Sequence, residues 1–80
     1  MMIVALTSSR NFKSKLVSIL DTAQEKGENG IVVLTDRSWH MKIFDYMNDM
    51  KSVGKLKLAG QTFFIIKEMR IELKPIDFYV

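Results

Sequence analysis

Two stretches of the chain, residues 2–6 and 31–34, are continuously apolar and rich in β-branched side chains. A continuous apolar run of this length is typical of a strand that is buried on both faces of a sheet. The sequence therefore predicts two buried strands. The helix-length segment between them predicts that they are parallel and joined by a right-handed crossover.

The segment between these strands has apolar residues at steps of three and four, which is the spacing of one helical face. We expect a helix from about residue 10 to residue 26. Ser8 and Ser9 stand just before it and are good N-cap residues. Gly27 follows it and supplies the left-handed position at which many helices end.

A second helical pattern follows residues 31–34. It begins after Asp36, which is a good N-cap, and we expect it to end at Gly54. Its apolar face is formed by Trp39, Ile43, Tyr46, Met47 and Met50. Most of the aromatic and methionine side chains fall on such faces, so we interpret them as core residues. For Trp39, one turn into the helix, a partly exposed binding anchor is the alternative.

From residue 55 the apolar period changes to two. Residues 55–58 alternate lysine and leucine, and residues 62–66 form a further apolar run after a glycine turn, which predicts an antiparallel pair of strands. The alternation in residues 69–74 either continues the last strand with a bend or forms a separate strand. Pro75 has no N–H to donate, so the regular strand should stop there or reach a sheet edge.

These elements predict an α+β fold with the order β-α-β-α-β-β. We expect two layers, in which two helices pack on a mixed four-stranded sheet, and one small globular domain over residues 1–80. This order of elements resembles the small domains of the Alba chromatin proteins and of the C-terminal part of translation initiation factor three. The resemblance implies a role in nucleic-acid binding.

Composition narrows the class of protein. The hydrophobic share of 48% and the charged share of 26% argue for a folded chain rather than a disordered one. Because the chain has no cysteine, it has no disulfide framework and no thiolate metal site. No basic leader and no apolar run of membrane-spanning length is present, so we expect a cytoplasmic protein without a membrane partner.

The candidate chemistry is sparse. His40 is the only histidine, and Asp36 lies four residues earlier on the same helical face. We interpret these two as a structural surface pair, with catalysis as the alternative. The turn that directly follows residues 2–6 contains no glycine, so a phosphate-binding loop is not expected. Capping of the helix explains Ser8 and Ser9, and anion binding by Ser8, Ser9 and Arg10 is the alternative. We therefore expect no enzyme, no metal site and no cofactor.

The charge is unevenly distributed. Residues 1–50 are neutral, whereas residues 51–74 carry +4 and the whole chain +3. The basic residues of the second region are Lys51, Lys55, Lys57, Lys67, Arg70 and Lys74. The alternation predicts that Lys55, Lys57, Arg70 and Lys74 share the solvent face or the edge of the sheet, where they would either bind nucleic acid or protect the edge from aggregation.

The C-terminal residues after Pro75 are unusually apolar for a tail. The candidate interface residues there are Ile76, Phe78, Tyr79 and Val80. This segment either packs on its own domain or adds to a second subunit or partner protein as an extra strand.

These observations predict a small non-enzymatic accessory or regulatory protein. The first hypothesis is non-specific DNA or RNA binding through the basic C-terminal hairpin. The alternative is a protein-interaction module, as a homodimer or as a binder of a partner protein, that uses the apolar tail and a sheet edge. A compact domain with no catalytic set is typical of accessory proteins in viruses and mobile elements.

Overall fold

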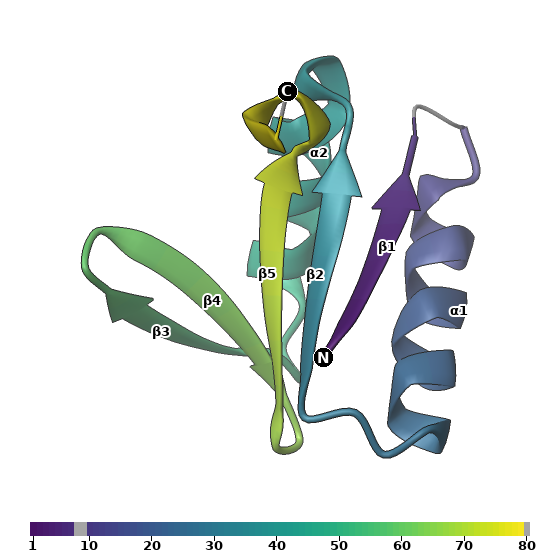
Figure 1. The fold of residues 1–80 in the computed structure, drawn as a ribbon, viewed down its shortest axis with the longest axis vertical. Coiled ribbons are helices and arrows are strands. Elements are labelled where there is room, and N and C mark those ends of the chain that lie inside the picture. The colour runs from purple at the N-terminus through teal and green to yellow at the C-terminus, as the bar shows by residue number, and fades with distance from the viewer. Residues whose placement is uncertain (8–9, 80) are drawn as a thin grey trace.

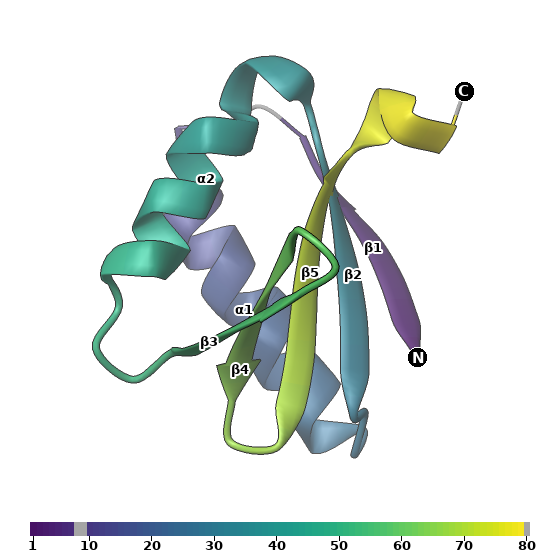
Figure 2. The ribbon, with the colours of Figure 1, turned by 90° about the vertical axis from the view of Figure 1, so that its left-hand side faces the viewer.

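The computed structural model describes residues 1–7 and 10–79, the last two of these by their backbone alone. Both helices lie on one side of the sheet and leave its other face uncovered by helices (Figures 1 and 2). The elements are β1 (Met2–Leu6), α1 (Phe12–Glu25), β2 (Gly30–Thr35), α2 (Arg37–Asp49), β3 (Gly54–Leu58), β4 (Gln61–Ile66), β5 (Met69–Pro75) and the 3₁₀ helix η1 (Ile76–Tyr79). The predicted α+β class is therefore confirmed.

The sheet is mixed and has the strand order β1-β2-β5-β4-β3. As predicted, β1 and β2 are parallel, and β5 is parallel to β2 on its other side. The hairpin β3–β4 is antiparallel and joins the sheet through β5. The sheet has five strands rather than the expected four, because the chain reverses at Lys67 (φ 52°) and pairs Ile66 with Met69.

The two continuous apolar strands differ in environment. In β2, Ile31, Val32 and Val33 are all buried, which confirms the prediction of a central strand. In β1, however, Ile3 is 58% exposed. The prediction that this strand is buried on both faces is wrong, because β1 lies at one end of the sheet and Ile3 points to the face that both helices leave uncovered (Figure 2).

Both predicted helices form, with shifted ends. Helix α1 begins at Phe12 after Asn11, and the expected caps Ser8 and Ser9 lie outside the described residues. Its C-terminal end matches the prediction, because Gly27 has a φ of 71° and the N–H of Glu28 donates to the carbonyl of Ala23.

Helix α2 buries Ile43 and Met47 and ends at Asp49 rather than at Gly54. Met50 has extended backbone angles, and the N–H of Val53 donates to its carbonyl in a turn that returns the chain to the core. Gly54 then begins β3, so the expectation that this glycine ends the helix is wrong.

The core lies between the helices and the sheet. It is one cluster of buried residues that includes Leu6, Leu16, Leu20, Ile31, Val33, Ile43, Met47, Phe64 and Ile71. Phe64 is the only aromatic residue among the fully buried side chains of the described residues, and its ring meets that of Phe44 edge to face at 5.2 Å between centroids. This pair attaches the hairpin β3–β4 to α2.

The other side of the sheet is called the open face below. Strand pairing places its residues, because paired residues on neighbouring strands point to the same side. The side chains that point away from the helices are those of Ile3, Ala5, Val32, Leu34, Leu56, Leu58, Gln61, Phe63, Ile65, Arg70, Glu72 and Lys74. The open face is therefore mainly apolar, and its charged residues are confined to β5.

Candidate nucleic-acid interface

The predicted basic residues of the C-terminal region do not form one strip. Lys55 pairs with Phe64, so it and Lys57 point to the helix-bearing side of the sheet. Arg70 pairs with Ile65 and points to the open face, as Lys74 does. The expectation of one shared face is wrong, because β3 directs its leucines rather than its lysines to the open face.

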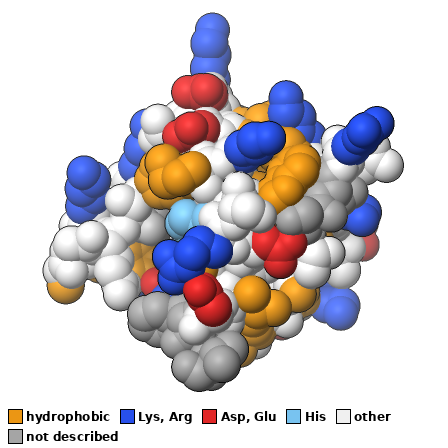
Figure 3. Space-filling view, turned by 90° about the horizontal axis from the view of Figure 1, so that it is seen from above, with side chains coloured by type: hydrophobic (Ala, Val, Ile, Leu, Met, Phe, Trp, Pro, Cys, Tyr) orange, Lys and Arg blue, Asp and Glu red, His pale blue; other side chains and the backbone are white. Residues whose placement is uncertain are grey.

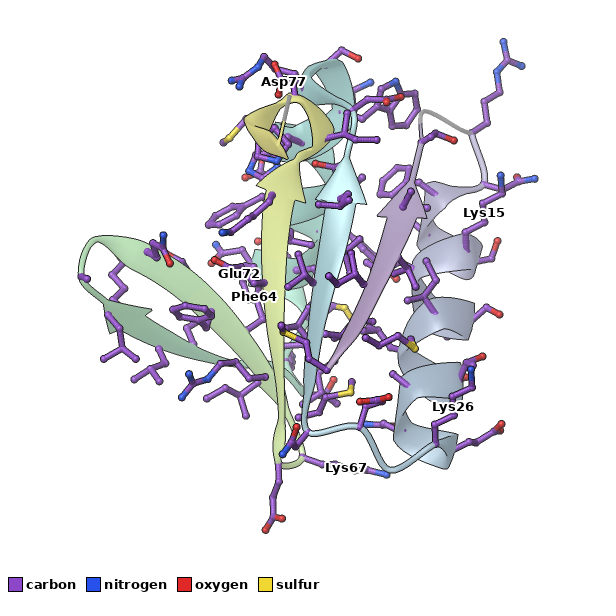
Figure 4. All side chains as sticks on the ribbon, viewed as in Figure 1. Lys15, Lys26, Phe64, Lys67, Glu72 and Asp77 are labelled. Carbon is purple, nitrogen blue, oxygen red and sulfur yellow. The ribbon has the colours of Figure 1, made fainter. Side chains whose placement is uncertain are left out.

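The remaining members of the predicted set are also dispersed. Lys51 is exposed in the turn after α2. Lys67 lies in the β4–β5 turn, at the end of the molecule opposite Asp77 (Figure 4). The Lys74 ammonium is 3.6 Å from the Glu72 carboxylate, and both side chains are largely buried. Only Lys55 and Lys57, two apart on β3, share a face and an edge.

The basic residue Arg70 covers an aromatic ring on the open face. Its guanidinium carbon is 5.2 Å from the centroid of the half-buried Phe63 ring. This distance is within the range at which a cation is attracted to the face of an aromatic ring. The open face thus carries one basic–aromatic pair beside the Glu72–Lys74 ion pair.

A larger group of rings joins the two helices. Phe12 at the start of α1 meets Trp39 at 5.4 Å and Tyr46 at 5.9 Å between ring centroids, both edge to face. All three side chains are half-buried. Edge-to-face pairs at such distances are favourable beyond the area that they bury, so the three rings hold the helices together at this point.

Two exposed lysines cover these rings. The ammonium nitrogen of Lys42 is 4.6 Å from the Trp39 ring centroid, and that of Lys13 is 5.2 Å from the Tyr46 ring centroid. We call these five residues the aromatic–lysine cluster. Two of the cation–ring contacts of the described residues therefore lie in this cluster, and the contact of Arg70 with Phe63 lies on the open face.

Sequence reasoning assigned Tyr46 to the core and Trp39 to the core or to a partly exposed binding anchor, but it did not connect either ring with a lysine. A signal was available: Lys42 follows Trp39 by three residues and precedes Tyr46 by four, spacings that place side chains on one side of a helix. The contribution of Phe12 and Lys13 depends on how α1 lies against α2, which periodicity within one helix does not reveal.

His40 has a structural environment. Its Nδ1 atom is 2.9 Å from the hydroxyl oxygen of the fully buried Thr35. Burial, and secondly the Arg37 guanidinium, lower the pKa of His40 below its ordinary value of 6.5. Figure 3 shows the ring at the surface of one end of the molecule, among hydrophobic, basic and acidic side chains. The ring is therefore mainly neutral at neutral pH.

The described residues offer no ready metal site. Within residues 1–7 and 10–79, no three histidine, aspartate or glutamate side chains gather where they could hold an ion. The Thr35 hydroxyl beside the His40 ring is fully buried. The enzymatic interpretation of His40 stays an untested alternative.

Within the described residues, an ion pair joins the C-terminal segment to the start of α2. Arg37 donates two hydrogen bonds, of 2.7 and 3.1 Å, to the Asp77 carboxylate. This exposed pair lowers the pKa of Asp77. Ile76 is 40% exposed, whereas the side chains of Phe78, Tyr79 and Val80 lie outside the described residues. An intermolecular role of this segment stays a prediction.

Comparisons with known proteins give no information on the function of this chain. Protein-family models, curated proteins and solved structures all gave no match to this chain. In the described part of the chain, no helix combines the length and the apolar character that a membrane span requires.

Proposed function

We propose that this protein binds single-stranded nucleic acid through the aromatic–lysine cluster, with little base specificity. The observation that supports the proposal concerns Trp39 and Tyr46, two rings that both contact Phe12. Each has a lysine ammonium over it, at 4.6 Å for Trp39 and 5.2 Å for Tyr46. Proteins that bind single strands combine aromatic rings, on which bases stack, with cations that follow the phosphates.

Binding would exchange partners within the cluster. Lys13 and Lys42 are exposed, long and flexible side chains, so their ammonium groups can swing from the rings to backbone phosphates. That movement uncovers the faces of Trp39 and Tyr46, onto which bases can stack. Stacking on an aromatic ring contributes about 1–3 kcal/mol per base and tolerates any base, because every base has a π face.

The electrostatic part of this binding should be modest. Two or three phosphate contacts to a single strand predict a slope between about −1.4 and about −2.1 in a plot of log affinity against log salt concentration. The original hypothesis of hairpin binding makes a different prediction, because Lys55 and Lys57 would then contribute the phosphate contacts. These two lysines have no ring partner among the described residues, so they could hold phosphates without stacking bases.

Matched charge reversals distinguish the two surfaces. Binding of a fluorescently labelled oligothymidylate of about 15 nucleotides is measured by anisotropy at about 50 mM salt. One variant carries Lys13→Glu and Lys42→Glu, and the other carries Lys55→Glu and Lys57→Glu, so both change the net charge equally. We expect the first to lose at least about tenfold in affinity and the second to lose much less.

A larger loss of affinity in the Lys55→Glu, Lys57→Glu variant would instead indicate that the hairpin binds the nucleic acid. Absence of binding by the folded wild-type protein at low salt would overturn the proposal altogether. Circular dichroism of each variant shows that a loss of affinity is not a loss of fold.

A further inference from the structure

The two edge strands of the sheet are built differently. At one end, β3 carries Lys55 and Lys57, which are exposed and of the kind that prevents edge-to-edge pairing. At the other end, β1 has five residues, none of them charged, and pairs only with β2 among the described strands. An apolar edge without protecting charges is a template for another extended chain.

Helix α1 runs beside this unprotected edge. Figure 1 shows α1 at the outer side of β1, away from β2. Between them lies a groove of about 310 Å³. Its lining residues are Ala5, Leu6, Thr7, Lys15, Ser18 and Ile19. A strand added to the edge of β1 would lie along this groove, with one of its faces against α1.

The side of α1 that borders the groove has a distinct pattern. Lys15, Ile19, Thr22 and Lys26 stand at steps of four, three and four and therefore follow one side of the helix. The two lysines are exposed and are labelled on α1 in Figure 4. They are eleven positions apart, which is about 16 Å along a helix. Four positions in a strand span about 13 Å, and the long, flexible lysine side chains can cover the difference.

We propose that the edge of β1 and this side of α1 bind an extended acidic peptide segment of a partner protein, which adds to the sheet as a sixth strand. Alternate residues of a strand share a face. The best segment therefore has acidic residues four positions apart, facing Lys15 and Lys26. An apolar residue between them faces Ile19, which is about 6 Å along the helix from Lys15, close to the span of two positions in a strand. Main-chain hydrogen bonds to β1 supply affinity, and the charges and the apolar contact supply specificity.

A second copy of this chain fits the groove less well. Pairing of β1 with β1 of another copy would bring two rows of Lys15 and Lys26 close to each other without any acidic residue from β1 to balance them. Like charges at such an interface are unfavourable. Charge complementarity thus favours an acidic partner. This inference does not depend on nucleic-acid binding, because the aromatic–lysine cluster uses other residues.

The test uses two synthetic peptides and the full chain. The acidic probe is a capped peptide of sequence TETVTET, and the control probe is TKTVTKT. Binding is followed by chemical-shift changes in the amide NMR spectrum of the protein and by hydrogen exchange of the β1 amides. We expect shifts and slowed exchange in β1 and along α1 with the acidic probe, and at least about tenfold weaker binding of the lysine probe.

Reversing the charges on α1 tests whether Lys15 and Lys26 determine which peptide binds. The variant Lys15→Glu with Lys26→Glu should reverse the preference and bind the lysine probe more tightly than the acidic one. The variant Lys13→Glu with Lys42→Glu, which disrupts the proposed nucleic-acid surface, should bind the acidic probe like the wild type. Equal binding of both probes, shifts centred away from β1, or self-association through β1 without peptide would overturn the proposal.

Discussion

Two pairs of lysines in this protein occupy opposite kinds of environment. Lys13 and Lys42 lie over aromatic rings on the helix layer, whereas Lys55 and Lys57 lie on an edge strand of the sheet, with no ring beneath them among the described residues. All four are exposed. A lysine over a ring holds a surface on which a base can stack, whereas a lysine on an edge keeps other strands away.

This difference shows why net charge is a weak guide to function in this chain. The excess of +4 in residues 51–74 predicted that the C-terminal hairpin binds nucleic acid. The structure divides those residues between two faces and two ends of the molecule. The neutral half of the sequence contains the two lysines that adjoin aromatic rings on α1 and α2.

The largest expected effect concerns the anchor of the hairpin. Phe64 is fully buried, so Phe64→Ala should lower the free energy of unfolding by about 3–5 kcal/mol. Phe12 is the half-buried centre of the aromatic–lysine cluster, so Phe12→Ala should lower the free energy of unfolding by only about 1–2 kcal/mol. Urea denaturation measures both. Equal losses would show that the two regions depend on their aromatic anchors to the same extent.

A smaller effect on stability is expected within the aromatic–lysine cluster. The edge-to-face contact of Phe12 with Trp39, at 5.4 Å, predicts a coupling free energy of about 0.5–1.5 kcal/mol. A double-mutant cycle of Phe12→Leu and Trp39→Leu, again by urea denaturation, measures it. A coupling close to zero would mean that the rings are neighbours without being mutually stabilising.

The two pairs of lysines should respond differently to loss of charge. Lys42→Met keeps most of the stem but removes the cation over Trp39, so stability should fall by about 0.5–1 kcal/mol. Lys57→Met should change stability by less than about 0.5 kcal/mol. Combined with Lys55→Met, it should instead promote concentration-dependent association, seen by sedimentation. A monomeric double variant would contradict the edge-protection role.

The smallest effect concerns His40, which belongs to neither region. Its pKa is lowered in the folded protein, so the unfolded chain binds a proton more readily. Stability should therefore be greatest above pH 6.5 and should decline as pH falls from there toward the folded pKa. His40→Asn should remove this part of the pH dependence, as urea denaturation across that range would show.

The Arg37 guanidinium is the second cause of this shift, after burial. Arg37→Ala should therefore raise the pKa of His40 only part of the way toward 6.5. NMR titration of the imidazole in the variant measures this change. A full return to 6.5 would mean that burial contributes little.

The sequence predicted those features that depend on local pattern. The apolar run of β2 and the periodicity that buries Leu16 and Ile43 required no knowledge of distant contacts. The turn at Lys67 was harder, because a non-glycine residue with a φ of 52° breaks the run without a glycine to mark it. Whether a strand is central or at an edge depends on which strands pair, so the exposure of Ile3 was not predictable from its own segment.

The candidate site was the least predictable part. The face to which Lys55 points follows from its pairing with Phe64. Alternation alone does not show whether the lysines or the leucines of β3 face the helices. The cluster joins Phe12 and Lys13 to side chains more than twenty positions away on α2. Only the packing of two helices brings these residues together.

The most direct test of the proposed function uses Trp39, because it is the only tryptophan in the chain. Its emission is followed while unlabelled oligothymidylate is added at low salt. We predict saturable quenching that weakens only modestly as salt is raised, disappears in Lys13→Glu with Lys42→Glu, and persists in Lys55→Glu with Lys57→Glu. Oligonucleotide binding by anisotropy without any change in Trp39 emission would contradict the account.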